Sequence, residues 1–338
     1  MKVLYMKPDT TLYFKEEPKP VPAGGQVLIR MAYASICNFD IMMWKGTAAY
    51  PPDGRISHEG SGVVEAVGPE VISFQPGDLV TILPSYGCGL CEDCRSKREE
   101  YCSNIHANTG LMTEYVLCDQ RSVFLLPPGL GLREGCLTEP LMMAMEAVRK
   151  ANLSDGANVV LMGCGAMGQI ILKLVRRHPV GKLVVIEPDA EKRKTALRFG
   201  ADFALNPDSG NIVSEALLLS NGRGYDAVLE ISGSQASAKQ ALHLAARGGS
   251  VVFFALYGMN FELNVNLFSL YWKDITITAV GVPSGVFPRA LRIAPSLRLS
   301  EVITGMFPFD QAVEAFEAKA RGGHAKVMLT FPGAAEGR

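Results

Sequence analysis

The chain has 338 residues, with 33 Lys and Arg against 34 Asp and Glu, and a formal net charge of −1. Single hydrophobic cores rarely grow this large, so two domains of ordinary size are expected. The near-neutral balance gives no electrostatic footprint for nucleic acid or for an anionic membrane surface. The expected partner is therefore a small-molecule substrate.

The N-terminal segment interleaves charges and prolines with short apolar runs, which is not the pattern of a signal peptide. No apolar stretch is long enough for a membrane span. The eight cysteines, without a secretory signal, favour a reducing compartment, where clustered thiols are more often metal ligands than disulfides. A cytoplasmic protein with no nucleic-acid or membrane partner is predicted.

From residue 1 to about 126 the sequence consists of short β-branched runs broken by Gly and Pro. This spacing favours a β-rich, partly barrel-like first domain. The runs that predict strands are residues 26–36, 60–68, 77–83 and 113–118.

The pattern changes after residue 126, because residues 141–151 have a helical period and later apolar runs alternate with helical segments. Near-continuous apolar strands of this kind indicate a parallel sheet covered on both faces, built from βαβ units. The five predicted strands are residues 157–163, 182–188, 225–232, 249–256 and 274–280. Residues 300–331 predict a strand, a helix from about Asp310 and a closing strand, which are expected to return to the first domain.

A glycine-rich turn follows the first of these parallel strands directly and opens a helix. Gly163 allows the tight turn, Gly165 lets the backbone approach a pyrophosphate, and Gly168 permits close helix packing. Ala166 and Met167 complete the turn, and the N–H groups of the helix start are expected to meet the phosphates. The motif predicts a dinucleotide site.

The second parallel strand ends in Glu187, about 20 residues beyond the glycines, where a ribose-binding acid is expected. A carboxylate there accepts hydrogen bonds from ribose hydroxyls and repels a 2′-phosphate, which favours NAD over NADP. A solvated strand end is the alternative role for Glu187. The nearby Lys192 and Arg193 keep NADP open as the cofactor.

Four cysteines lie close together in a loop at about residues 86–104, namely Cys88, Cys91, Cys94 and Cys102. Four thiolates on one short loop suit a closed tetrahedral zinc site. An iron–sulfur cluster and disulfides are the rival interpretations. Because four sulfurs leave no open coordination position, this zinc is expected to hold the loop rather than take part in chemistry.

Cys37 and the pair His58-Glu59 are candidates for a second metal site. A lone Cys or His is more often a packing residue than a ligand. A Cys, a His and a carboxylate beside a dinucleotide-binding domain can nevertheless form a catalytic zinc site with an open position. Cys118, Cys136 and Cys164 are expected to be packing residues, with Cys136 kept as a possible substitute ligand; these three stand apart from the four-cysteine loop.

Several motifs occur in one order over nearly the whole chain: Cys37-x-x-Asp40, His58-Glu59, the Pro-Gly-Asp turn at Pro76, the four-cysteine loop, TEPL at residues 138–141 and GCGAMG at residues 163–168. In this order they resemble the zinc-dependent medium-chain dehydrogenase/reductase family, in its polyol, sorbitol and threonine dehydrogenase branch. The resemblance implies an α/β fold with a Rossmann doubly wound parallel-sheet domain at residues 143–289. A GroES-like catalytic domain would comprise residues 1–142 and 290–338.

The resemblance also implies roles for single residues. Cys37, His58 and Glu59 would surround a catalytic zinc, Glu139 would bind it directly or through water, and Asp40 would orient a ligand. With the structural zinc this makes two ions per chain. The implied reaction is hydride transfer between NAD and a secondary alcohol or ketone, with a polyol, sugar derivative or cyclitol expected as substrate. A homodimer or homotetramer is also implied.

The chain departs from the family pattern after the first cysteine. The family places a hydroxyl residue two positions on and often a histidine three positions further, whereas this chain has Phe39 and Met42. Neither side chain can relay a proton, so Glu59, Glu139 or zinc-bound water is a candidate base, and His106 a candidate replacement.

The same departure fits a reductase of a conjugated alkene or iminium, in which Phe39 and the Met42–Trp44 segment would line an apolar pocket. Core packing is the alternative for that segment. A non-catalytic, nucleotide-sensing protein is the remaining hypothesis.

Overall fold

The computed structural model describes every residue except 50, 52, 259, 284 and 334–338. The chain forms two compact units, unit 1 (Met1–Met142 with Pro283–Arg338) and unit 2 (Met143–Val282). The second boundary lies before the predicted residue 290, because α10 (Phe287–Ile293) belongs to unit 1. Its Phe287 is fully buried and packs against Phe124, with the ring centroids 5.0 Å apart.

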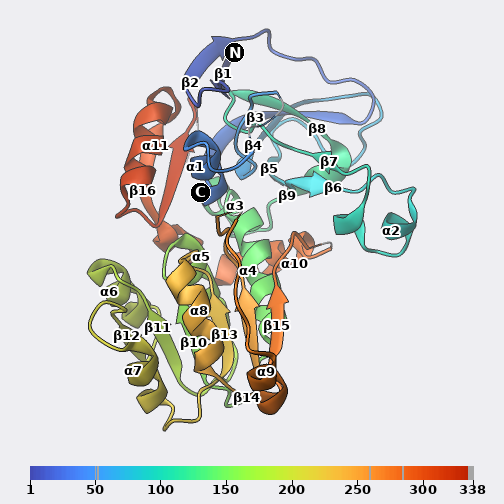
Figure 1. The fold of residues 1–338 in the computed structure, drawn as a ribbon. Helices are drawn as coiled ribbons and strands as arrows, with labels where there is room; N and C mark the ends of the chain where they lie inside the picture. Colours follow the sequence, from blue (N-terminus) through green and yellow to red (C-terminus); the bar gives the residue numbers. More distant parts are fainter. Residues whose placement is uncertain (50, 52, 259, 284, 334–338) are drawn as a thin grey trace. The chain divides into compact units, whose positions relative to one another are not determined.

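Unit 1 is built on a seven-stranded sheet with the order β16-β17-β3-β4-β5-β9, in which β8 also pairs with β3. Two small antiparallel pairs, β1-β2 and β6-β7, accompany it (Figure 1). The strand bounds are β1 Lys2–Met6, β2 Leu12–Glu16, β3 Gln26–Ile36, β4 Gly60–Val67, β5 Leu79–Ile82, β6 Ser85–Tyr86, β7 His106–Ala107, β8 Tyr115–Asp119, β9 Val123–Leu125, β16 Ile303–Pro308 and β17 Lys326–Thr330. The helices are α1 Asn38–Trp44, α2 Glu92–Arg95, α3 Leu132–Gly135, α4 Thr138–Ala151, α10, and α11 Ala312–Arg321.

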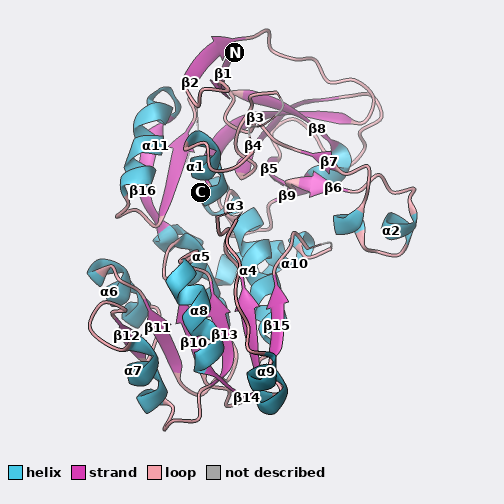
Figure 2. Ribbon diagram, in the orientation of Figure 1, coloured by secondary structure: helices cyan, strands magenta, loops and turns pink. Residues whose placement is uncertain are grey.

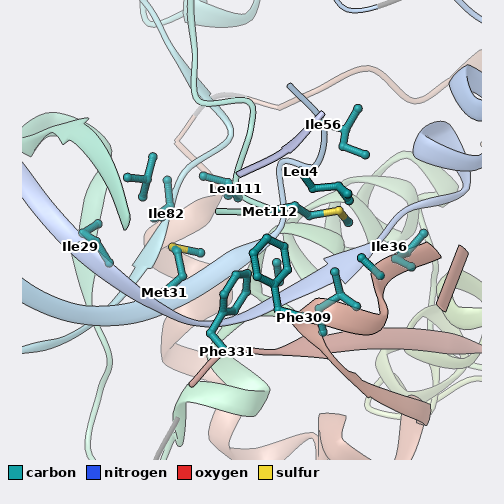
Figure 3. Packing of buried hydrophobic residues seen from close by; sticks show 14 of the residues in the cluster. Leu4, Ile29, Met31, Ile36, Ile56, Ile82, Leu111, Met112, Phe309 and Phe331 are labelled. Carbon is teal, nitrogen blue, oxygen red and sulfur yellow. The ribbon is translucent and has the colours of Figure 1, made fainter. Parts of the chain in front are cut away.

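One hydrophobic core joins the two ends of the chain within unit 1. Figure 3 shows Phe309 and Phe331 from the C-terminal segment packed among Leu4 and Met31 from the N-terminal strands. The two phenylalanine rings lie 4.4 Å apart between centroids. Each such buried side chain contributes about 1.5–3 kcal/mol relative to an exposed one. This shared core accounts for the pairing of the closing strand β17 with β3, which places that segment in the first unit.

Unit 2 is a six-stranded parallel sheet with the order β12-β11-β10-β13-β14-β15, and helices alternate with the strands along the chain (Figure 2). This order is that of a doubly wound dinucleotide-binding domain, so the predicted fold class is confirmed. The strands are β10 Val159–Met162, β11 Leu183–Ile186, β12 Phe203–Leu205, β13 Tyr225–Glu230, β14 Ala245–Phe253 and β15 Thr276–Ala279. The helices are α5 Ala166–Val175, α6 Ala190–Arg198, α7 Ile212–Leu219, α8 Gln235–Leu244 and α9 Leu267–Lys273.

The edge strand β12 is the parallel strand that the apolar pattern does not predict. It has only three residues, and its first, Phe203, is 39% exposed. A short edge strand does not need the continuous apolar run by which buried parallel strands are recognised.

Replacing Phe287 with alanine is expected to lower the free energy of unfolding of unit 1 by about 3–5 kcal/mol, because the lost ring leaves a cavity. Ile72→Ala, at a side chain 93% exposed in the same unit, is the control and should change it by less than about 0.5 kcal/mol. Urea denaturation followed by circular dichroism measures both. Equally small effects would show that α10 is not part of this core.

Candidate functional site

Asp40 holds together the two segments that carry the predicted metal ligands of unit 1. Cys37 follows β3 and caps the start of α1, and its backbone N–H donates to the Asp40 carboxylate at 2.8 Å. The N–H of Ser57, next to His58, donates to the other carboxylate oxygen at 3.1 Å. Asp40 is completely buried, and burial raises the pKa of its carboxyl. The contacts support the predicted orienting role of Asp40.

A tight bend at Ser57 turns the chain immediately before His58. Ser57 has a φ of +75°, which is uncommon for a residue other than glycine. Its carbonyl accepts the Gly110 N–H at 2.9 Å and its hydroxyl donates to the Ser35 carbonyl at 3.3 Å. These bonds fix the strained residue, as is common beside functional sites.

The structure brings Cys37, His58 and Glu59 together. One ligand atom from each lies within 4.8 Å of the others. Three protein ligands of this type with a fourth position open suit a catalytic zinc, so the residues fit that ion. Glu139, buried in the first turn of α4, lies outside this group but is close enough to interact electrostatically with His58 and Glu59.

The ionisable groups of this cluster shift one another's pKa values. Burial raises the pKa of Glu139 to about 7, with Glu59 and Asp40 adding to the effect. Burial opposes the charged form of His58, yet the hydrogen bond with Cys37 and the charges of Cys37 and Glu139 outweigh it and raise the pKa of His58 well above its usual value. A divalent cation relieves such crowding of negative charge.

Lys326 is a site residue that the sequence patterns did not reveal. Its side chain is buried and forms an ion pair with Glu59, whose carboxylate also accepts the Ser35 hydroxyl. Burial would raise the pKa of Glu59, but the Lys326 ammonium and His58 outweigh burial and lower it. In the sequence, a lysine in the closing strand cannot be distinguished from an ordinary solvent-exposed lysine. Its place in the site becomes visible only from the pairing of β17 with β3.

The four-cysteine loop has the geometry of a tetrahedral metal site. All four sulfurs lie within 4.8 Å of one another, with Cys88 and Cys94 4.0 Å apart and Cys91 and Cys102 3.7 Å apart. Zinc–sulfur bonds of about 2.3 Å in a tetrahedron place sulfurs about 3.8 Å apart. The backbone N–H groups of Leu90 and Cys91 both donate to the Cys88 sulfur and, with other hydrogen bonds, lower the pKa of that thiol to about 6. The loop therefore fits the predicted structural zinc.

The remaining cysteines lie in buried positions. Cys118, Cys136 and Cys164 are each at most 2% exposed, and burial raises the pKa of each thiol to about 12. Cys136 also lies outside the group formed by Cys37, His58 and Glu59. These positions support packing roles.

The glycine turn of unit 2 has the backbone that a dinucleotide site needs. Gly163 has a φ of +105°, and Gly165 is the N-cap of α5 with open space at the position of a side chain. At Gly168 an added Cβ would lie 2.3 Å from the Gly163 carbonyl oxygen. Glycine is therefore needed at position 163 for the positive φ and at position 168 for close packing of the helix on the turn. At Gly165 the open space is available to a ligand.

Glu187 is joined to the glycine turn. Its carboxylate accepts the Cys164 N–H at 2.7 Å and the Asp189 N–H at 3.1 Å, on different oxygens. The side chain is buried and is not the solvated strand end given as the alternative. Arg193 turns its guanidinium to the carbonyl oxygens of Glu187 and Pro188, at 2.8 and 2.5 Å.

Comparisons with known proteins agree with these two units. The alcohol dehydrogenase GroES-like domain model matches residues 23–128, and the zinc-binding dehydrogenase model matches residues 166–296. A solved structure from Clostridium scindens, assigned as a zinc-binding dehydrogenase, superimposes with a TM-score of 0.90 at 31% identity, covering 97% of this chain and 98% of that one. The chain belongs to the zinc-dependent medium-chain dehydrogenase/reductase family.

Two curated members of this family show which branch is similar. Sorbitol dehydrogenase from Halalkalibacterium halodurans is 29% identical over 98% of this chain and 99% of its own length. L-Threonine 3-dehydrogenase from Pyrococcus abyssi is 28% identical, with 97% of both chains covered. The predicted class, a zinc-dependent dehydrogenase of the polyol branch, is confirmed, and the alkene or iminium reductase is not favoured. Over the described residues, no helix is both long and apolar enough to cross a membrane.

The residues predicted to line an apolar pocket or to replace the proton relay lie in different surroundings. Phe39 is 36% exposed in the first turn of α1, next to Cys37. Trp44, at the end of that helix, packs edge-on against Phe316 at 5.8 Å and borders the core. His106 is exposed, stacks on Tyr86 at 5.1 Å and lies outside the ligand group. These contacts favour the packing interpretation for Trp44 and give no support to His106 as a proton relay.

Two glycine variants test the cofactor turn. Gly168→Ala is expected to separate α5 from the turn, lowering the melting temperature of the protein and weakening NADH binding about tenfold or more. Gly165→Ala, where the Cβ meets open space, should leave the melting temperature unchanged but weaken NADH binding similarly, because the added methyl would obstruct the pyrophosphate. Thermal denaturation and NADH fluorescence titration separate the two effects. Unaltered NADH binding by Gly165→Ala would contradict the assigned site.

Proposed function

We propose that the protein oxidises the secondary alcohol of a polyol or sugar derivative with NAD, and reduces the corresponding ketone, at a zinc site formed by Cys37, His58 and Glu59. The supporting observation is that ligand atoms of these three side chains lie within 4.8 Å of one another. Three protein ligands are the number that leaves a fourth tetrahedral position for a substrate. Similarity to sorbitol dehydrogenase supports the substrate class.

Zinc bound there would act as a Lewis acid that favours the alkoxide form of the substrate, and NAD would accept the hydride. The protein's part is to hold the ligands and to receive a proton. Asp40 fixes the Cys37 and Ser57 backbones, which limits the movement of two ligand segments. A second ion in the four-cysteine loop, giving two zinc per chain, would stabilise that loop without taking part in the reaction.

Glu139 is the proposed proton acceptor, directly or through water. The position after Cys37 at which the family has a hydroxyl is occupied by Phe39, which cannot accept a proton. Glu139 is buried beside the ligand group, and burial raises the pKa of its carboxyl to about 7, in the range suited to a general base. The carboxylate form therefore predominates above neutral pH.

The cofactor preference that we infer is NAD over NADP. Glu187 is held at the end of β11 by the turn that would bind the pyrophosphate. Its fixed negative charge opposes a 2′-phosphate, while carboxylate lone pairs remain for ribose hydroxyls. Arg193 donates through Nη1 to the carbonyl oxygens of Glu187 and Pro188, which holds that nitrogen at the strand end.

A homodimer through the free edge of the unit 2 sheet is also proposed. Strand β15 lies at the end of the sheet, and α9, which precedes it, has seven residues. Four of these side chains are large, apolar or aromatic, and at least 59% exposed: Leu267, Phe268, Tyr271 and Trp272. Exposed edges and apolar patches of this kind are normally covered, and a two-fold axis lets β15 pair with its own copy.

Zinc analysis with an activity screen tests the reaction. We expect about two zinc ions per chain and NAD reduction with polyols or sugar derivatives, at a higher kcat/KM than with NADP. Cys37→Ser should lose one zinc and the activity while keeping the fold, since it removes an open-site ligand. Cys88→Ser should instead lose the loop zinc. Two zinc ions retained in Cys37→Ser would overturn the assigned catalytic site.

The pH dependence of alcohol oxidation tests Glu139. Its carboxyl is protonated below about pH 7, so the wild-type kcat should rise with pH through that value. Glu139→Gln is expected to lower kcat roughly 100-fold and remove this rise. Glu146→Gln is the control, because Glu146 is equally buried on the same helix but pairs with Arg149. An unchanged profile in Glu139→Gln would exclude Glu139 as the base.

Tyr271→Glu should convert the dimer into a monomer, because two charges would be buried across the proposed axis. Light scattering after size exclusion measures the mass, which should fall by half. Ile72→Glu, at an exposed site of unit 1, should leave the mass unchanged. A wild-type protein that is already monomeric would refute the proposed interface.

A further inference from the structure

One face of three adjacent strands in unit 1 carries the proposed catalytic ligands. In the β17–β3 register Val327 faces Ile36 and Met328 faces Ser35. Lys326 and Cys37 are the next residues of the two segments, so the register brings them close to each other. On the other side of β3, the Ser35 N–H donates to the Glu59 carbonyl at 3.1 Å. Side chains opposite one another, and alternate residues along a strand, share a face. Glu59, Ser35, Cys37 and Lys326 are thus placed together by strand pairing.

The contacts of the Glu59 carboxylate are asymmetric. The Lys326 ammonium and the Ser35 hydroxyl both bond to the same oxygen, Oε2. Glu59 and Lys326 have side-chain exposures of only 1% and 4%, so water does not compete for the pair.

We propose that Lys326 is a positioning residue for the catalytic metal, which holds the Glu59 carboxylate through Oε2 and so fixes its orientation beside Cys37 and His58. The inference rests on the proposed zinc site at Cys37, His58 and Glu59. Nothing in the motifs around these ligands assigns a role to Lys326, which lies almost at the other end of the chain.

The surroundings of Lys326 favour this role over simple anchoring of β17. A buried ammonium is costly unless it is paired, and an anchor would need only one partner. Lys326 also interacts electrostatically with Cys37 and Glu139, so it adjoins three acidic groups of the site. Without the Lys326 ammonium, the Glu59 carboxylate would keep only the Ser35 hydroxyl as a fixed donor and would be freer to rotate.

Lys326→Met tests the proposal, with Lys326→Arg as the conservative variant and Lys319→Met as the control. Lys319 also contacts the start of β17, since its amine donates to the Ala325 carbonyl at 2.6 Å, but it leaves Lys326 in place. Each purified protein is titrated with Co²⁺ in competition with a chelator, and visible absorption reports the coordination of the bound cobalt. Loss of an outer-shell partner typically weakens metal binding 10–100-fold.

We expect Lys326→Met to bind the cobalt of the Cys37 site 10–100-fold more weakly and with altered ligand-field bands, while Lys326→Arg and Lys319→Met resemble the wild type. Wild-type affinity and bands in Lys326→Met would overturn the proposal. If Lys326→Met does not fold, Ser35→Ala removes the other donor to Oε2 without unpairing the charge and should still alter the bands; unaltered bands in that variant would also overturn it.

The titration also separates this proposal from the proposed function. A wild-type protein that takes up only the metal of the four-cysteine loop would refute the zinc site itself, and with it the role of Lys326. Two metals in the wild type, with one unaffected by Lys326→Met, would leave the zinc site standing and refute only the positioning role.

Discussion

The antiparallel pairing of β17 with β3 is the constraint on which the proposed catalytic site depends. It places residues from the last part of the chain beside Ser35 and Ile36, directly before Cys37. The pairing is stabilised by a core that includes Phe309 and Phe331, so the energy that fixes this geometry comes from apolar packing remote from the ligands. Rigid elements of this kind are suited to hold ligands within the narrow tolerance that a metal requires.

Burial makes the site depend on its charges. Glu59, Asp40 and Glu139 are all nearly excluded from water, where unpaired carboxylates are costly. Lys326 and the backbone N–H donors to Asp40 offset part of that cost. In the proposed site, a divalent cation at Cys37 and His58 would offset more of it.

Much of the site could be predicted because its motifs are local. The four cysteines lie on one loop and the three glycines in one turn, so spacing alone predicted both geometries. Cys37 and His58 required the family resemblance, because separate segments bring them together. Lys326 could not be found in either way, since its role follows from strand pairing across most of the chain. Strand β12 was not predicted for a different reason, because its sequence is short and partly exposed.

The substitution at Phe39 connects these observations to the reaction. Phe39 replaces the hydroxyl residue that the family has at this position, so the usual proton relay is absent. The Asp40 carboxylate still fixes the backbone N–H groups of Cys37 and Ser57, and these bonds do not involve the Phe39 side chain. The proton must then leave by a group already at the site. Glu139 is the carboxyl whose burial brings its pKa to about 7, whereas Lys326 keeps the pKa of Glu59 low. In the proposed mechanism, these different surroundings would make Glu59 a ligand and Glu139 a base.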